Sequence, residues 1–495
     1  MEALSAFFNC PPIYVDENDA ARVFPELFDA GLFELLECIV SDGDLFEDCT
    51  EWTEYVLDIL EYLSIVSSGT QHWNGTEWAD NDPDDSEDDE VMWIPPDLND
   101  FRHRLANLFA LTFQDAWARR DLFVVGCRND LYHVEDWVPS SGDIRSGIRR
   151  LLFLSPYLRT PPFMQNPNAT QAFRKLCLLL WMSPDSDFDG ADTLFAVVTS
   201  SFDVEPEKQQ AAFANFVVED MVAVYGALPI LERICQALKR PEEGLGSGLH
   251  CTLFVGAAQV LTCNDFWPYL SQTKVFPALD YAIDYHLQKY PQKDTKLEFN
   301  MVFSTVKLAH ILTRNAPFQS GAGFLIRETN IVSLLARFIV FSLNEAKVSE
   351  PKPFMDAIGE WIKIASALSL RSGKNEIRKK FKQSLRHEWY PTLKRLRTTA
   401  CSEQARREQV LDVWTALGTA IGLEEGKAKA EYEREMKHAA QFCAWKDCRF
   451  HTVKPDTPTR ACAGCDEVRY CGKPCQQRDW KEGGHKLRCR RIKAG

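Results

Sequence analysis

Residues 443–489 read CAWKDCRFHTVKPDTPTRACAGCDEVRYCGKPCQQRDWKEGGHKLRC. Seven cysteines and one histidine in this stretch follow the spacing C-x4-C-x13-C-x2-C-x5-C-x3-C-x9-H-x3-C and form four pairs, namely Cys443/Cys448, Cys462/Cys465, Cys471/Cys475 and His485/Cys489. A structural zinc ion takes four thiolate or imidazole ligands, and a closely spaced pair lets one tight turn present two of them. The stretch therefore predicts two zinc sites. Both are expected to be structural, because eight ligands leave no coordination position for a reactive water.

This stretch resembles the MYND-type zinc finger. The resemblance rests on the order of the four pairs, on the tripeptide Arg469-Tyr470-Cys471, and on a CQxxDW run at 475–480 that precedes the histidine. It implies an interleaved arrangement, in which one zinc ion is held by Cys443, Cys448, Cys471 and Cys475 and the other by Cys462, Cys465, His485 and Cys489. The first spacer and the second gap are longer than in the family, and His451 in that gap is an alternative ligand to Cys448. A module this short depends on its metal ions for its folding free energy.

The rest of the chain is long enough to bury a large core and shows helical periodicity. Apolar residues recur three or four positions apart, as in VFPELFDAGLFELLECIV at 23–40 and IVSLLARFIVFSL at 331–343. Further helices are expected at 54–66, 105–118, 143–154, 170–182, 206–228, 229–238, 247–262, 277–289, 296–314, 353–370 and 376–390, with prolines at the starts of several and inside none. Such helices bury their faces by stacking on one another. The predicted fold class is mainly α, a large all-α helical array that is either armadillo-like or HEAT-like or irregular, with a small two-zinc module.

Composition marks two segments that differ from this array. Residues 79–90 read ADNDPDDSEDDE, which predicts a disordered acidic loop, with an acidic docking segment for a basic partner as the alternative. Residues 424–437 are polar nearly all round, which is typical of a helix that bridges domains through water, and Gly418, Gly422 and Gly426 are expected to act as a hinge. The expected organisation is an N-terminal helical region at 1–78, an acidic loop at 79–97, a helical array at 98–401, a helical connector at 402–442, the zinc finger at 443–489 and a basic tail at 490–495.

Charge is distributed unevenly along the chain. From Arg371 onward there are 29 Lys and Arg against 16 Asp and Glu, a net charge of +13, so the preceding 370 residues carry −28 of the total of −15. The basic runs at 378–382 and 486–491 are candidates for contacts with phosphates or with a nuclear import receptor. These runs lack the interleaved aromatic residues on which bases stack. Contacts with the acidic body or with solvent are therefore favoured, and nucleic-acid binding is not expected.

A zinc finger with closed metal sites indicates a binding module. The resemblance implies that a proline-containing peptide of the PxLxP kind lies along the finger surface, with Gln476 and Trp480 as contact residues. Trp480 offers a flat apolar face for a proline ring and Gln476 can pair with the peptide backbone, whereas the alternative is that Trp480 only covers the second zinc site. A further contact position of the family is Ala463 here instead of a hydroxyl residue. We therefore expect an adaptor, in which the finger captures proline-containing peptides and the helical body binds a second protein partner.

The alternative function is an enzyme. Some MYND fingers are inserted in SET-domain lysine methyltransferases, but the Asn-His-Ser type motif of those enzymes is absent, as are HExxH, GxxxxGK[ST] and GxSxG. An enzyme would need an active site in the helical body without a recognisable motif. We expect no enzymatic activity, no small-molecule substrate and no cofactor besides two structural zinc ions. The scattered remaining cysteines, the missing signal pattern and the missing apolar run of ~18 residues predict an intracellular protein, cytoplasmic or nuclear, that binds no membrane.

Overall fold

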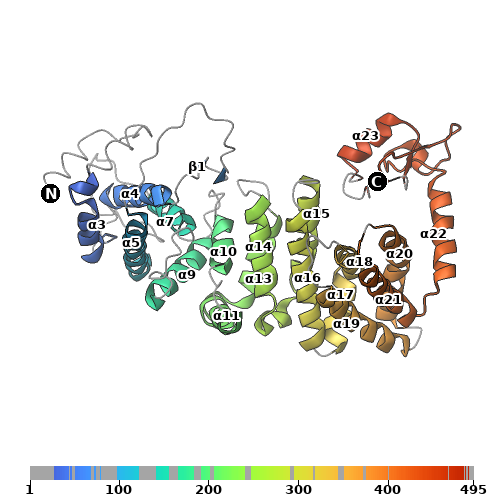
Figure 1. The fold of residues 1–495 in the computed structure, drawn as a ribbon, viewed down its shortest axis with the longest axis horizontal. Coiled ribbons are helices and arrows are strands. Elements are labelled where there is room, and N and C mark those ends of the chain that lie inside the picture. Colours follow the sequence, from blue (N-terminus) through green and yellow to red (C-terminus); the bar gives the residue numbers. More distant parts are fainter. Residues whose placement is uncertain are drawn as a thin grey trace. The chain divides into compact units, whose positions relative to one another are not determined.

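The computed structural model describes most of the chain, and its described residues are mainly helical, which confirms the predicted fold class (Figure 1). The described residues are 27–43, 45–46, 51–67, 72–73, 78–79, 97–121, 141–154, 166–182, 191–200, 206–239, 247–289, 295–315, 318–343, 351–371, 375–399, 401–465, 468–483, 485 and 489. Most of the predicted acidic loop at 79–97 and the whole basic tail at 490–495 lie outside them.

The chain divides into two compact units. The first lies within Met1–Met221 together with Glu242–Leu249, and the second within Val222–Pro241 together with His250–Gly495. The division falls inside the segment 98–401 that we predicted as one array. The zinc finger and the predicted connector at 402–442 both belong to the second unit.

Helices of the first unit pack on the next helix but one. Its elements are α3 (Leu32–Ser41), α4 (Glu51–Ser67), the antiparallel pair β1 (His72–Trp73) and β2 (Trp78–Ala79), α5 (Leu98–Ala118), α7 (Ser141–Leu154), α9 (Pro167–Met182), α10 (Ala191–Ser200) and α11 (Pro206–Asn215). Helix α3 packs on α5, α4 on α7, α5 on α9, and α7 on α10. This alternation buries apolar side chains between two rows of helices, as stacked helical arrays do. Among the most deeply buried are Phe109, Phe113 and Trp181.

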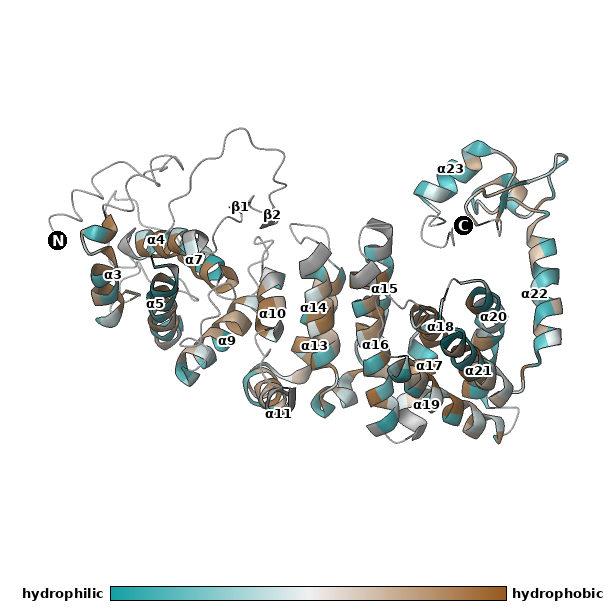
Figure 2. Ribbon diagram, viewed as in Figure 1, coloured by the Kyte–Doolittle hydropathy of each residue, from teal (hydrophilic) through white to brown (hydrophobic). Residues whose placement is uncertain are grey.

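The second unit is also built of packed helices. The π-helix η2 (Phe216–Val222) belongs to the first unit except for Val222. The elements of the second unit are α12 (Ala223–Tyr225), α13 (Ala227–Lys239), α14 (Ser247–Val260), whose first three residues belong to the first unit, the 3-10 helix η3 (Asn264–Tyr269), α15 (Val275–Lys289), α16 (Thr295–Asn315), α17 (Phe318–Glu328), α18 (Ile331–Phe341), α19 (Lys352–Ser369), α20 (Glu376–Thr398), α21 (Gln404–Ala420) and α22 (Glu425–Ala439). Helix α16 packs on α18, α18 on α20, and α19 on α21. Between these helices Phe338 and Phe354 stack with ring centroids 4.2 Å apart. In the hydropathy view many body helices, such as α13 and α14, carry brown hydrophobic stretches, whereas α22 is largely teal (Figure 2).

Two of the predicted helices are interrupted at glycines. The predicted helix at 23–40 is broken at Gly31, whose φ of 91° is left-handed, so α3 begins only at Leu32. The predicted helix at 206–228 changes to a π-helix at Phe216–Val222 and stops at Gly226, which has a φ of 81°. A right-handed helix cannot continue through a residue with positive φ. Periodicity of apolar residues alone did not reveal either break.

Helix α20 continues through a proline, contrary to the prediction that it ends at Tyr390. Pro391 lies inside α20, which runs on to Thr398. A proline in a helix interior removes one backbone hydrogen bond and costs about 3 kcal/mol. The continued segment buries Leu393 and Leu396 completely, and burial of each leucine contributes roughly 1.5–3 kcal/mol. Packing thus offsets the cost of the proline.

Two glycines of the predicted hinge have structural roles in α21 and at its end. Gly418 is buried in α21, where an added Cβ would lie 2.1 Å from Cε2 of Trp389. Gly422, with a φ of 79°, ends α21 in a Schellman motif, in which Leu423 N–H donates to the Gly418 carbonyl at 2.9 Å. Gly418 is therefore a close-packing position and Gly422 a helix stop.

Helix α22 is not a solvent-bridging arm, which corrects the prediction for 424–437. Two carboxylates on α22 pair with arginines of α20: Glu431 with Arg386, and Glu425 with Arg397 at 2.6 Å. Between these pairs Tyr432 packs on Tyr390 with ring centroids 5.6 Å apart. Ala428 is the one buried residue of α22, so this helix contacts α20 through exposed charge pairs and the tyrosine contact, with little apolar burial.

Among the described residues, no single helix combines the length and the apolar character needed to cross a membrane. Helices Ala211–Tyr225 and Ala227–Lys239 reach the necessary length only when they are counted together across the break between them.

Candidate metal centre

The zinc module is built from short elements around a small apolar core. Residues after α22 form the turn that contains Cys443 and Cys448, followed by the 3-10 helix η4 (Arg449–His451). Strands β3 (Arg460–Ala461) and β4 (Arg469–Tyr470) pair antiparallel, and helix α23 (Lys473–Lys481) follows. Trp445 and Tyr470 are buried among the cysteines. With so few apolar residues, the core depends on metal binding to be stable.

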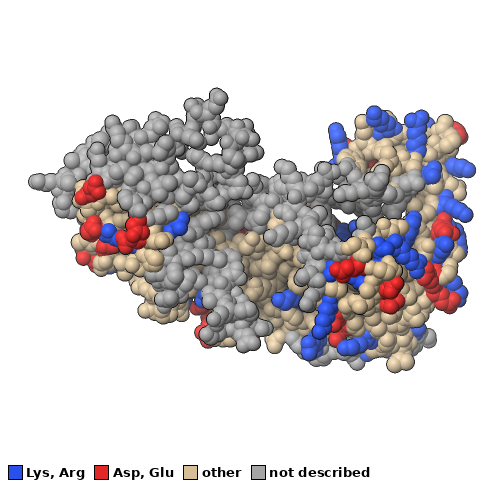
Figure 3. Space-filling view, in the orientation of Figure 1, with Lys and Arg blue, Asp and Glu red and all other residues tan. Residues whose placement is uncertain are grey.

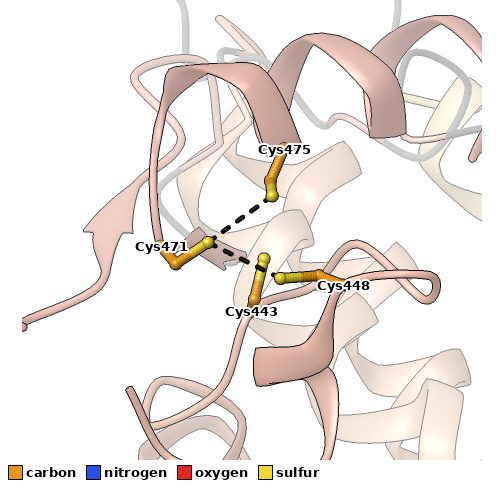
Figure 4. Close-up of side chains that lie close together, drawn as sticks. All are labelled: Cys443, Cys448, Cys471 and Cys475. Atoms are coloured by element: carbon orange, nitrogen blue, oxygen red, sulfur yellow. Dashed lines mark hydrogen bonds between the residues drawn. The ribbon is translucent and has the colours of Figure 1, made fainter. Parts of the chain in front are cut away.

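The first ligand group brings together Cys443, Cys448, Cys471 and Cys475. The two early cysteines come from the turn after α22, Cys471 follows β4, and Cys475 lies in the first turn of α23, so that all four side chains point toward one centre (Figure 4). The Sγ atom of Cys471 lies 3.6 Å from that of Cys448 and 3.5 Å from that of Cys475. Sulfur atoms at 2.3 Å from a tetrahedral zinc ion are about 3.8 Å apart. The group therefore fits one zinc ion.

The second group brings together Cys462, Cys465, His485 and Cys489. Nε2 of His485 lies 3.3 Å from Sγ of Cys462 and 3.9 Å from Sγ of Cys465, and the Sγ atoms of Cys462 and Cys489 are 3.9 Å apart. A tetrahedral zinc ion separates its sulfur and nitrogen ligands by about 3.6 Å. This group fits a second zinc ion, and the two groups interleave along the chain in the order that the resemblance implied.

The chain's own electrostatics also favour a cation in each group. Burial opposes ionisation of Cys448, but the backbone N–H of Phe450, which donates to its Sγ at 3.4 Å, and the neighbouring thiols together lower its pKa. Burial and neighbouring thiols raise the pKa of Cys475, and in the second group they raise the pKa of Cys489 to about 12. Crowded thiols cannot all ionise unless a positive charge lies among them. A divalent cation would supply that charge.

His451 does not join either group. Its Nδ1 lies 2.9 Å from the carbonyl oxygen of Cys443, and Cys448 occupies the position for which His451 was the alternative. The imidazole thus stabilises the backbone of the turn that presents Cys443.

The residues around the ligands include a buried pair whose role sequence reasoning missed. The Tyr470 hydroxyl donates to Oδ2 of Asp479 at 2.7 Å, and both residues are buried. Burial and this hydrogen bond raise the pKa of Tyr470. An added Cβ at Gly483 would lie 1.9 Å from Oδ1 of Asp479 and 2.8 Å from the Trp445 ring. The pair fastens α23 to β4 and so holds Cys475 beside Cys471. The sequence shows that Tyr470 precedes Cys471 and that Asp479 precedes Trp480. It does not show that the tyrosine donates a hydrogen bond to the aspartate.

The two predicted peptide contacts lie on α23. Gln476 and Trp480 are four residues apart, on one face of the helix, and each is partly exposed. The Trp480 ring meets the His485 ring edge to face, with centroids 5.8 Å apart. Trp480 therefore covers the second ligand group on one side and keeps part of its surface accessible.

The finger is tied to the end of α22 by a side-chain hydrogen bond. Thr459, in the loop before β3, donates from Oγ1 to the Ala440 carbonyl at 2.6 Å. Ala440 is the C-cap residue of α22, where a helix leaves its final carbonyl groups without partners, and the Thr459 hydroxyl supplies a donor to that carbonyl. The bond links the loop before β3 to the helix that leads into the finger.

Comparison with known proteins identifies the zinc module. The family model of the MYND finger matches residues 443–489. No curated protein and no solved structure matches the chain. MYND fingers are generally known for protein–protein interaction. The chain therefore carries, on a large helical body, a MYND finger whose two Cys/His groups fit two structural zinc ions.

Proposed function

We propose that this protein is an adaptor, in which the finger captures a proline-containing peptide and the helical body binds a second protein. The observation that supports this most directly is the geometry of α23, where Gln476 and Trp480 share one partly exposed face. Tryptophan is well suited to stack on a proline ring, and an amide side chain can pair with an extended peptide backbone.

In this proposal the zinc ions are structural. Cys443, Cys448, Cys471 and Cys475 would bind one ion, and Cys462, Cys465, His485 and Cys489 the other. Each ion then has four protein ligands, which leaves no coordination position for a substrate or an activated water. The ions contribute the folding free energy of the finger and fix the orientation of α23. We accordingly propose no catalytic role for the zinc ions, and we propose none for the body.

The helical body is suited to a second partner. Stacked helices present long continuous surfaces, and proteins built in this way commonly bind extended partners along them. Together the two parts would bring two proteins close to each other. We place this adaptor inside the cell, where zinc-binding thiols stay reduced.

The test is peptide capture by the full-length protein and by matched variants. A fluorescent peptide that contains PxLxP should bind wild type, and Trp480→Ala and Gln476→Ala should each weaken binding at least tenfold, as is typical of contacts worth more than about 1.4 kcal/mol. Because Trp480 packs on His485, each variant is first shown to retain two zinc ions. Arg478→Ala, on the opposite side of α23, is the control and should bind normally. If both contact variants retained zinc and bound the peptide as tightly as wild type, the peptide would not bind at this face of α23.

A further inference from the structure

The loop at 452–459, between η4 and β3, carries an accessible threonine. Thr457 is exposed and lies outside regular secondary structure. Among the described residues, none forms a hydrogen bond with its hydroxyl group. No residue of this loop belongs to either ligand group. The Thr457 hydroxyl can therefore react without loss of a zinc ligand.

Pro458 sets the backbone conformation at this position. A proline has no backbone N–H and a fixed φ, and it favours an extended conformation at the residue before it. Thr457 and Pro458 are both exposed. A protein kinase binds its substrate as an extended chain, and proline-directed kinases accept a proline directly after the hydroxyl residue. The pair Thr457-Pro458 has this form.

A basic residue follows at the third position after Thr457. Arg460 is exposed and forms no ion pair with a described residue. Four Ser-Pro or Thr-Pro pairs occur in the chain, at Ser155, Thr160, Ser183 and Thr457, and the third residue after the hydroxyl residue is basic only for Thr457. Kinases distinguish substrates partly by the pattern of charges near the acceptor. This pattern favours Thr457 over the other three.

The loop is anchored on both sides of Thr457. Pro455 is buried, and Thr459 donates a hydrogen bond to the Ala440 carbonyl at 2.6 Å. The Thr459 bond has to open for several residues to extend into a kinase cleft. One hydrogen bond of this kind lowers the population of the open loop about two- to tenfold. The fold therefore slows modification of Thr457 without excluding it.

A phosphate group at Thr457 would reverse the charge of this loop. Residues 452–460 contain Lys454 and Arg460 against Asp456, a net charge of +1. Lys and Arg side chains are spread over the finger in the space-filling view (Figure 3). A phosphothreonine adds a charge of about −1.5 to −2 at pH 7, and its oxygens accept strong hydrogen bonds from cations such as Lys454 and Arg460.

An alternative role for the Thr-Pro pair is to shape the turn alone. Such a role needs the proline ring but neither a free hydroxyl group nor a basic residue at the third position. The hydroxyl group that does hold this loop belongs to Thr459.

We propose that Thr457 is the acceptor residue of a proline-directed Ser/Thr protein kinase. The kinase transfers the γ-phosphoryl group of Mg-ATP to Oγ1 of Thr457. The O–P bond to ADP breaks, the Oγ1–P bond forms, and the hydroxyl proton passes to the catalytic aspartate of the kinase. The product is a phosphothreonine on an exposed loop of the finger, with both ligand groups intact.

The test is phosphorylation of the full-length zinc-loaded protein by a purified cyclin-dependent kinase with Mg-ATP, with the sites quantified by mass spectrometry. Thr457 should be modified, whereas Thr452 and Thr459, which no proline follows, should not. Pro458→Ala should abolish modification of Thr457. Arg460→Gln should slow it by a factor of roughly 1.4 to 5, as for loss of one exposed ion pair. Each variant is first shown to retain two zinc ions.

Lys454→Gln is the matched control, because it removes a cation of the same loop that precedes the acceptor, and it should be modified at the wild-type rate. If the kinase modified a synthetic peptide of residues 452–461 but not Thr457 in the protein, the fold would conceal the site and the proposal would be overturned. Equal modification of wild type and Pro458→Ala would also overturn it. Phosphate at Thr457 that requires Pro458 and decreases in Arg460→Gln, but not in Lys454→Gln, would support it.

Discussion

Replacement of Gly418 by alanine should destabilise the second unit strongly, because this glycine allows α20 and α21 to approach closely. An added Cβ would lie 2.1, 2.4 and 2.5 Å from Cε2, Nε1 and Cδ2 of Trp389. The indole ring cannot move away freely. Its Nε1–H donates to the Trp414 carbonyl at 2.9 Å, and Trp414 Nε1–H donates to the Trp389 carbonyl at 3.1 Å.

The magnitude follows from three contributions. The ring must shift by more than 1 Å to reach a normal carbon contact of about 3.5 Å, and such overpacking costs about 1–3 kcal/mol. Loss of the buried indole hydrogen bond costs a further 1–3 kcal/mol or so. Alanine recovers about 1 kcal/mol of helix propensity. The net loss of unfolding free energy is then about 1–5 kcal/mol, which for a unit of this size lowers the melting temperature by roughly 2–20 °C.

Calorimetry of the full chain measures the effect, and hydrogen exchange locates it in α20 and α21. The matched control is Gly359→Ala in α19, where an added Cβ meets nothing within 4 Å. That variant should be neutral or more stable by up to about 1 kcal/mol. If Gly418→Ala were as stable as Gly359→Ala, the close approach of Gly418 to Trp389 would be refuted.

Three further predictions concern charge and hydrogen bonding. Burial raises the pKa of Asp280 to about 6, so the free energy of unfolding of the wild type should fall as pH rises from about 4 through 6. In urea titrations, Asp280→Asn should have the same free energy of unfolding as wild type near pH 4 and a value about 1–3 kcal/mol higher than wild type at pH 7. Tyr470→Phe leaves the Asp479 carboxylate without its hydroxyl donor and should speed zinc loss to a chelator by several fold, whereas an unchanged rate would show that the pair does not hold the finger. Arg386→Glu should increase hydrogen exchange in α22, and the exchanged pair Arg386→Glu with Glu431→Arg should restore protection; equal protection in all three proteins would contradict ionic docking of α22.

The spacing of the metal-ligating residues was predictable because zinc coordination is local chemistry. Short spacers between ligands restrict the geometry so strongly that the pairing is visible in one sequence. The hydrogen bond between Tyr470 and Asp479 was not predictable, since it depends on how α23 lies against β4. Contacts between separate elements leave no periodic signal in the sequence.

Helices were predictable where their apolar face is continuous, and their ends were less so. Helix α18 was predicted within two residues of its observed end, since its seven buried residues follow helical spacing. Helices α10 and α17 were missed. The first contains β-branched residues that also fit a strand, and the second contains two glycines, which weaken a helix. In both segments the local helix propensity is weak, and packing against other helices determines that a helix forms.

The docking of α22 was missed for a related reason. Its sequence is charged with alanines between, which describes a solvated helix equally well. The basic side chains that it meets belong to α20, 45 and 28 residues earlier in the sequence, so that neither segment reveals the pairing alone.

Zinc content measured by elemental analysis on the purified full-length protein tests the central claim most directly, because the peptide face exists only if both ligand groups hold a metal ion. We predict two zinc ions per chain for wild type and one for Cys471→Ala, with the helical circular dichroism of the body nearly unchanged. One zinc ion or none in the wild-type protein would contradict the two-site assignment and, with it, the proposed role of the finger.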